Sequence, residues 1–235
     1  MDLFESINSF DGIFLDSSVV GEIKKYLDMG IINGVTTNPS IMLKDGVTGG
    51  LNGIKERSTE IASLVYPRPV SIEVLSNDAS EMLEQAHEFS TWASNINVKI
   101  TIHGPHGELD NLKIVHELES KCSTRVNVTA MMSVQQCFLA AQAGASYVSL
   151  FCGRISNMGY DPSSEIKKLR ALLTKHGLKA KIIACSVREA INVTDWLGAG
   201  ADIVTVPPSF IDTMIVHPYS KETVQMFLDD AVKLN

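Results

Sequence analysis

Residues 125–153 read RVNVTAMMSVQQCFLAAQAGASYVSLFCG, and this stretch decides the fold. Its two ends, 125–132 and 147–153, are short runs rich in apolar and β-branched residues. Residues 134–144 between them have the spacing of an amphipathic helix that closes on Gly144. A strand, a helix and a second strand in this order predict a parallel βαβ unit, because parallel strands need a crossover connection.

The same alternation continues in both directions along the chain. Six further β-rich runs begin at Ile13, Gly34, Val70, Asn97, Lys181 and Asp202, which brings the total to eight. Helical patterns lie between runs at 80–94, 108–121, 163–177 and 187–200. Eight βα units in roughly 200 to 250 residues are typical of a TIM barrel. We therefore predict an α/β protein with a single (β/α)8 barrel domain over residues 1–235; a doubly wound open sheet is the alternative.

Composition narrows the class of protein. The net charge of −7 over 235 residues argues against nucleic-acid or anionic-membrane binding and leaves room only for a small positive pocket. The acidic N-terminal residues do not resemble a signal peptide, and no apolar run is long enough to cross a membrane, so we expect a cytoplasmic protein. The four cysteines have neither disulfide nor zinc spacing, and we expect reduced core thiols and no metal site.

Polar side chains inside the predicted strands indicate a functional site. Side chains alternate along a strand, so Lys99 points to the opposite face from its apolar neighbours, toward the barrel interior. By the same rule Glu73, Asn127 and Thr129 point inward, and Asp16 ends the first run. A buried ion pair would be the purely structural explanation, but such pairs add little stability. Polar groups near the carboxyl ends of barrel strands favour a catalytic site.

This set of residues suggests Schiff-base chemistry. Burial disfavours the charged form of a lysine, and the free amine is a nucleophile toward carbonyl carbon. A protonated imine on Lys99 would withdraw electrons from a neighbouring carbon–carbon bond of a sugar. Asp16 could move the proton at that bond, and Glu73 with Thr129 could handle the water of imine formation. Asn38 and Asn127 could hold substrate hydroxyls, and no metal or organic cofactor is required.

Five motifs in order make the chain similar to a known family. GVTTNPSIM from Gly34, NVKITI around Lys99, NVTAMMSVQQ from Asn127, SLFCGRI from Ser149 and ACSVREA from Ala184 resemble the transaldolase family in the short form shared with fructose-6-phosphate aldolases. The resemblance covers nearly the whole chain. It implies a sugar-phosphate enzyme that forms a Schiff base in a TIM barrel and needs no cofactor.

The resemblance also assigns roles to single positions. Lys99 matches the Schiff-base lysine, Asp16 the general acid/base, and Glu73 with Thr129 the pair that positions the catalytic water. The positions that match substrate contacts are Thr36, Asn38, Asn127, Ser149 and Phe151. Those that match the phosphate-binding group are Arg154, Ser186 and Arg188. A forked, permanently charged guanidinium suits a phosphate, although Arg188 could also be a solvated residue at a helix start.

Two positions discriminate within this family. The aldolase branch resembles a version with glutamine in place of Glu73 and tyrosine in place of Phe151, whose hydroxyl helps to release the enamine as free dihydroxyacetone. Phe151 has no hydroxyl, so the enamine should persist until an acceptor aldehyde arrives. We expect a transaldolase of the pentose phosphate type; the alternatives are aldolase-like cleavage and a related enzyme for another anionic sugar.

Other features leave further alternatives open. The loop KITIHGPHGE adds His103 and His106 where the family usually has KVPVT, either with little role or for altered acceptor recognition. The chain stops at AVKLN without the extra C-terminal helix that interlocks subunits in some short-form members, so we expect a homo-oligomer of unknown size, and nothing in the sequence favours a large ring. Two other classes would keep the fold: a phosphate-binding isomerase or lyase that uses Lys99 only for its charge, and a non-catalytic sugar-phosphate sensor.

Overall fold

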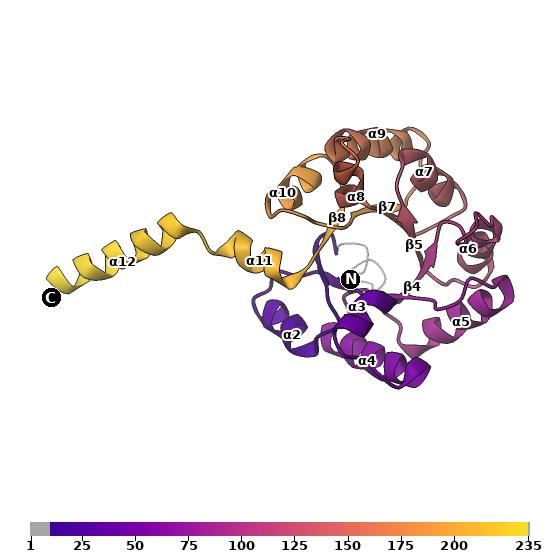
Figure 1. The fold of residues 1–235 in the computed structure, drawn as a ribbon, viewed down its shortest axis with the longest axis horizontal. Helices are drawn as coiled ribbons and strands as arrows, with labels where there is room; N and C mark the ends of the chain where they lie inside the picture. Colours follow the sequence, from indigo (N-terminus) through magenta and orange to yellow (C-terminus); the bar gives the residue numbers. More distant parts are fainter. Residues whose placement is uncertain (1–9, 235) are drawn as a thin grey trace, which may run out of the picture.

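A closed barrel of parallel strands forms the centre of the molecule (Figure 1). The computed structural model describes residues 10–234, and neighbouring strands pair in sequence order until β8 pairs with β1. The strands are β1 (Gly12–Asp16), β2 (Gly34–Thr36), β3 (Val70–Glu73), β4 (Ile96–Thr101), β5 (Val126–Met131), β6 (Tyr147–Leu150), β7 (Lys181–Ala184) and β8 (Ile203–Val206). The predicted TIM barrel is confirmed, and each of the eight β-rich runs coincides with a strand.

Helices surround the barrel as an outer ring, except for the C-terminal helix, which projects away from it (Figure 1). Within the described residues they are α2 (Val20–Asp28), α3 (Pro39–Lys44), α4 (Gly50–Val65), α5 (Ala79–Trp92), α6 (Asp110–Lys121), α7 (Val134–Gln142), α8 (Cys152–Asn157), α9 (Pro162–Lys175), α10 (Ile191–Gly198), α11 (Pro208–Ile215) and α12 (Pro218–Lys233). The short helices α3 and α8 follow β2 and β6 directly. Both helices therefore lie near the end of the barrel where the strands terminate.

Side-chain caps fix the beginning of several of these helices. Asp78, Ser133 and Asp161 each accept hydrogen bonds from the first-turn backbone N–H groups of α5, α7 and α9. Those N–H groups have no partner inside the helix, so an oxygen acceptor at this position favours the start of the helix. Pro162 adds to this at α9, because its fixed φ suits the first helical position.

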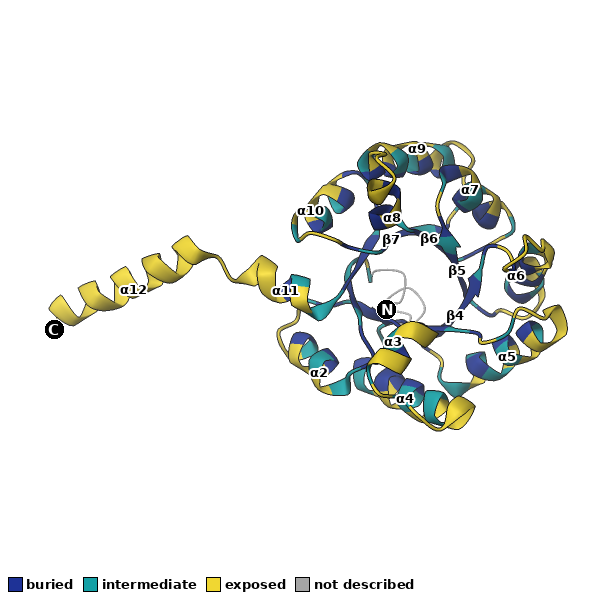
Figure 2. Cartoon of the chain, in the orientation of Figure 1, coloured by how far each residue is buried: buried dark blue, intermediate teal, exposed yellow. Residues whose placement is uncertain are grey.

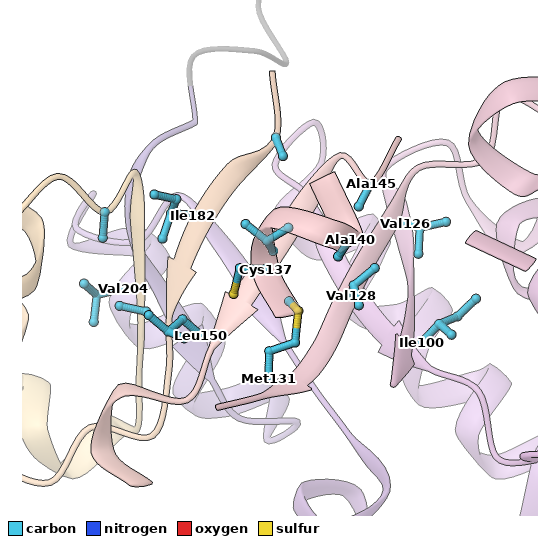
Figure 3. Close-up of a cluster of buried hydrophobic side chains, with 14 of the residues drawn as sticks. Ile100, Val126, Val128, Met131, Cys137, Ala140, Ala145, Leu150, Ile182 and Val204 are labelled. Carbon is cyan, nitrogen blue, oxygen red and sulfur yellow. The ribbon is translucent and has the colours of Figure 1, made fainter. Parts of the chain in front are cut away.

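The hydrophobic core has two parts. The larger part lies between strands and helices, where side chains such as Val126, Val128 and Ile182 meet α7 and its neighbours (Figure 3). A separate small cluster contains Phe14, Tyr147, Ile183, Cys185 and Ile203. Since Ile182 and Val204 belong to the outer part, alternation places Ile183 and Ile203 inside the barrel.

Gly34 shows how closely this inner cluster is packed. A Cβ at Gly34 would lie 2.7 Å from the Phe14 ring, so any side chain there would displace this ring from the inner cluster.

The cysteine prediction holds for three of the four residues. Cys137, Cys152 and Cys185 are buried and form no disulfide, whereas Cys122 is exposed after α6. The prediction of a core thiol is therefore wrong for Cys122, because this residue lies beyond Leu118, the last buried position of α6.

The C-terminal segment corrects another expectation. We expected no extra helix, yet α12 runs for 16 residues and projects away from the barrel (Figure 1). None of its residues is buried, although Val224, Phe227, Leu228 and Val232 are apolar (Figure 2). These residues recur at helical spacing and give α12 an apolar face with no partner in the described chain.

Candidate active site

One cavity collects nearly all of the residues that the sequence singles out. It has a volume of about 260 Å³ and opens at the carboxyl ends of the strands. The predicted residues that line it are Asp16, Thr36, Asn38, Lys99, Thr129, Ser149, Phe151, Arg154, Ser186 and Arg188. Glu73 and Asn127 do not line the cavity. Each contacts a residue that does: Glu73 forms an ion pair with Lys99, and Asn127 accepts a hydrogen bond from Ser149.

Lys99 is held at the centre of the site by two oxygen atoms. It is 6% exposed, and its Nζ donates a hydrogen bond to the Thr37 carbonyl oxygen at 2.9 Å. The Glu73 Oε2 lies 3.4 Å from the same nitrogen. This ion pair follows from strand register, because Glu73 of β3 is paired with Lys99 of β4. The amine is thus fixed in position before any substrate binds.

Asp16 provides the second ionisable group of the cavity. Burial raises the pKa of its carboxyl group, and the nearby Lys99 charge and a hydrogen bond from Thr36 oppose this rise without cancelling it. Thr36 Oγ1 donates to Asp16 Oδ1 at 2.7 Å, and the two residues are paired on β2 and β1. A carboxyl group with a raised pKa can both take up and release a proton nearer to neutral pH.

Strand β5 brings Thr129 into the cavity at an irregular point of the sheet. The pairing of β5 with β6 shifts between Val128 and Met131, and Ala130 has a φ of 61°. A left-handed backbone is unusual for a residue other than glycine, and such conformations cluster at functional sites. Thr129 lies directly before this bulge and is 2% exposed.

Asn127 does not line the cavity, although it is the register partner of Lys99. It is fully buried, its Oδ1 accepts from Ser149 Oγ at 2.7 Å, and its Nδ2 donates to Ser71 Oγ at 3.1 Å. Both ends of the amide are therefore used within the protein. In this structure Asn127 orients Ser149, and Ser149 is the one of the pair that reaches the cavity.

Asn38 has a structural role in addition to lining the cavity. Its Oδ1 accepts from the Ile41 N–H at 2.9 Å, which makes it the N-cap of α3, and Pro39 follows at the first helical position. The capping oxygen is occupied, so the amide NH₂ is the part of Asn38 that can face a substrate.

Two arginines give part of the cavity lining a positive charge. Arg154 and Arg188 are both exposed lining residues, and among residues 10–234 no carboxylate forms an ion pair with either one. The Arg154 guanidinium lies over the Phe151 ring, 5.8 Å from its centroid. Two guanidinium groups without an ion-pair partner form a local positive charge, of the kind that suits an anion, in a protein with a net charge of −7.

Gly153 allows the start of α8, which carries Arg154, to lie close to the segment that carries Ser186 and Arg188. A Cβ on Gly153 would lie 1.7 Å from the Ser186 carbonyl oxygen, and the Gly153 N–H donates to the Cys185 carbonyl oxygen at 3.2 Å. Ser186 itself has a φ of 68°. Only glycine permits this approach of backbone to backbone, which brings Ser186 next to the start of α8.

Sequence reasoning missed four lining residues: Cys185, Val187, Thr205 and Pro207. Burial raises the pKa of the Cys185 thiol to about 12, so it stays protonated and is a poor nucleophile. The loop residues His103 and His106 are exposed and do not line the cavity.

Neither a metal-binding cluster nor a membrane-spanning helix is present among the described residues. Residues 10–234 contain no group of three His, Cys, Asp or Glu side chains placed to hold a metal ion. No helix in that part of the chain combines the length and apolar character needed to cross a membrane.

Comparison with known proteins identifies the class of protein. The family model described as Transaldolase/Fructose-6-phosphate aldolase matches residues 13–235, and the chain belongs to this family. It is 40% identical over 218 residues to a "Probable transaldolase" of Carboxydothermus hydrogenoformans, covering 93% of this chain and 96% of that protein. A "Probable transaldolase" of Shouchella clausii is 39% identical, with 94% and 97% covered.

A solved structure supports the fold alone. Thiamine phosphate pyrophosphorylase from Pyrococcus furiosus superposes with a TM-score of 0.59 at 11% identity, over 85% of this chain and 87% of that one. The family and the relatives together make the protein an enzyme of the transaldolase and aldolase type.

Proposed function

We propose that this enzyme is a transaldolase that transfers a dihydroxyacetone unit from a ketose phosphate to an aldose phosphate through a Schiff base on Lys99. The observation that carries the proposal is that Lys99 lines one cavity together with Asp16, Thr129 and two arginines that could bind an anion. Fructose 6-phosphate and sedoheptulose 7-phosphate are the proposed donors. The reaction would take place in the cytoplasm as part of the pentose phosphate pathway.

The proposed steps balance without a cofactor. The Lys99 amine adds to the ketone carbon, and loss of water gives the protonated imine, with Glu73 and Thr129 positioning that water. Asp16 then takes the proton of the C4 hydroxyl while the C3–C4 bond breaks. The electron pair moves to the imine nitrogen, and the aldose phosphate leaves. The enamine adds to an acceptor aldehyde, Asp16 returns the proton, and hydrolysis frees the lysine.

Phe151 supports transfer rather than simple cleavage. Its ring lines the cavity and carries no proton donor, and the Arg154 guanidinium packs against it. An enamine beside this ring has no phenolic hydroxyl to protonate it. We therefore favour transaldolase over aldolase.

Dependence of the reaction on an acceptor tests this choice. With fructose 6-phosphate and erythrose 4-phosphate, we expect catalytic release of glyceraldehyde 3-phosphate that requires the acceptor, with little free dihydroxyacetone. Equal release of glyceraldehyde 3-phosphate and free dihydroxyacetone without acceptor would favour the aldolase alternative. No reaction with any ketose phosphate would favour a phosphate-binding barrel of other chemistry or a sensor.

The arginine pair should decide the preference for a charged substrate. Replacing Arg154 by alanine removes one guanidinium from the proposed phosphate site, and we expect KM for fructose 6-phosphate to rise about 10- to 100-fold. KM for unphosphorylated fructose should change little, because that sugar has no anion to lose. Steady-state kinetics with both sugars measure the difference. Arg125→Ala removes an arginine outside the cavity and is the matched control; equal losses for both sugars in Arg154→Ala would contradict a phosphate role.

We also propose that the protein is a homo-oligomer and that α12 contributes to its interface. The apolar face of α12 has no partner within the described chain, and exposed apolar faces of this kind usually mark contacts between proteins.

Light scattering during size-exclusion chromatography tests this role of α12. Phe227→Asp places a charge on the apolar face and should reduce the measured mass, whereas Met226→Asp, which replaces an exposed apolar residue on the other side of the helix, should not. Equal masses for the wild type and both variants would show that α12 does not hold the subunits together.

A further inference from the structure

Thr205 is a cavity residue without an assigned role. It lies on β8, is 4% exposed and lines the same cavity as Lys99 and Asp16. Its hydroxyl forms a hydrogen bond with the Thr36 hydroxyl. A threonine in a strand is usually explained by β-propensity, so this contact cannot be inferred from the sequence.

Strand order explains why these residues meet. β1 carries Asp16 and is flanked by β2 on one side and by β8 on the other. Thr36 of β2 is paired with Asp16, and Thr205 of β8 is paired with Phe14, two residues before Asp16 on the same face of β1. Thr36 therefore bridges Asp16 and a hydroxyl from the far side of β1.

The number of protons fixes the direction of this chain of hydrogen bonds. A hydroxyl group has one proton to donate, and an ionised carboxylate can only accept. Because Thr36 Oγ1 gives its proton to Asp16 Oδ1, it can only accept in its contact with Thr205. Thr205 must then be the donor, and a hydroxyl that accepts a hydrogen bond donates a stronger one.

We propose that Thr205 is a positioning residue that orients the Thr36 hydroxyl toward Asp16 and thereby supports the ionised carboxylate that accepts the substrate proton. This inference rests on the proposed function, since it concerns the proposed base of the same reaction. Thr205 acts through Thr36 and does not itself touch the reacting atoms.

The charged groups around Asp16 define the sign of the effect. Lys99 of β4 and Lys44 of α3 favour its ionised form, whereas burial and Asp45 at the end of α3 disfavour it. The hydrogen bond from Thr36 is on the favourable side. Weakening that bond removes support from the charged form, so the pKa of Asp16 should rise, and the base form should be lost at higher pH than in the wild type.

Two substitutions at Thr205 and one control test the proposal. Thr205→Val keeps the shape but removes the hydroxyl, and we expect kcat to fall about tenfold with KM nearly unchanged. The acid limb of the kcat profile should move to higher pH. Thr205→Ser keeps the donor and should restore both kcat and the profile. Thr124→Val alters another buried threonine outside the cavity and should leave the profile unchanged.

A carboxyl ¹³C titration separates this proposal from the proposed function. The Asp16 resonance is identified by its loss in Asp16→Asn, and in Thr205→Val its titration should shift to higher pH whether or not the enzyme turns over fructose 6-phosphate. An unshifted titration would overturn the role of Thr205 even if transaldolase activity is present. A Thr205→Ser variant as impaired as Thr205→Val would also overturn it, because the loss would then come from packing of the methyl group.

Discussion

Replacing Lys99 by methionine is expected to abolish covalent capture of the substrate. Methionine is similar in length to lysine but has no amine, so no imine can form, and transfer activity should fall about 10⁴-fold or more. The measurement is intact mass after borohydride reduction with fructose 6-phosphate. The wild type should gain a three-carbon dihydroxyacetone unit, because the aldose phosphate leaves and the enamine waits for an acceptor. Lys99→Met should gain nothing.

The position of Lys99 makes this a sharp test. Its Nζ lies between the Thr37 carbonyl oxygen and the Glu73 carboxylate, so an amine placed here only for its charge would also be well held. Such a lysine would bind substrate without forming a borohydride-stable bond. Lys24→Met removes an exposed lysine that pairs with Asp28, and this control should keep the adduct. A wild type without an adduct from any ketose phosphate would exclude the Schiff base.

The sequence predicts Lys99 and its neighbours well because strand alternation is a strong rule. A polar residue between apolar ones in a barrel strand faces the interior, and this rule alone predicts the orientation of Lys99, Glu73 and Thr129. The depth of a side chain within the barrel is harder to predict. Asn127 is paired with Lys99 across β4 and β5, yet only the longer Lys99 side chain lines the cavity, because the Asn127 amide is bonded to Ser149 and Ser71 instead.

Features that depend on approach between distant segments were not predictable. Gly153 appears in the sequence as one glycine of a motif, and only the fold shows that the Ser186 carbonyl oxygen occupies the place of its Cβ. The presence of Thr205 in a strand is already explained by its β-propensity. No feature of the neighbouring sequence shows that its hydroxyl contacts the Thr36 hydroxyl across β1. The helix α12, by contrast, was predictable, because Val224, Phe227, Leu228 and Val232 recur at helical spacing; the family resemblance alone led to the wrong expectation.

Asp16→Asn is expected to separate imine formation from bond cleavage. Asparagine keeps the size of the side chain but cannot take the proton of the C4 hydroxyl, so the C3–C4 bond should remain intact. We expect kcat to fall about 10²- to 10⁴-fold. Borohydride treatment with fructose 6-phosphate should still modify Lys99, because the amine and Glu73 remain. The trapped species should be the whole six-carbon sugar phosphate in place of the three-carbon unit.

The pH dependence gives a second readout of the same substitution. Burial raises the pKa of Asp16, so in the wild type the ionised base is lost as pH falls through a value above that of an ordinary aspartate. The rate of cleavage should fall in that range, and Asp16→Asn should show no such limb in its residual rate.

An exposed aspartate supplies the matched control. Asp28→Asn removes a carboxylate from the surface pair with Lys24 and should retain both the acid limb and the three-carbon adduct. A three-carbon adduct formed at the wild-type rate in Asp16→Asn would contradict the assignment, because the proton of the C4 hydroxyl would then have another acceptor. The mass of the adduct thus reports directly whether Asp16 acts at the carbon–carbon bond or only holds the site together.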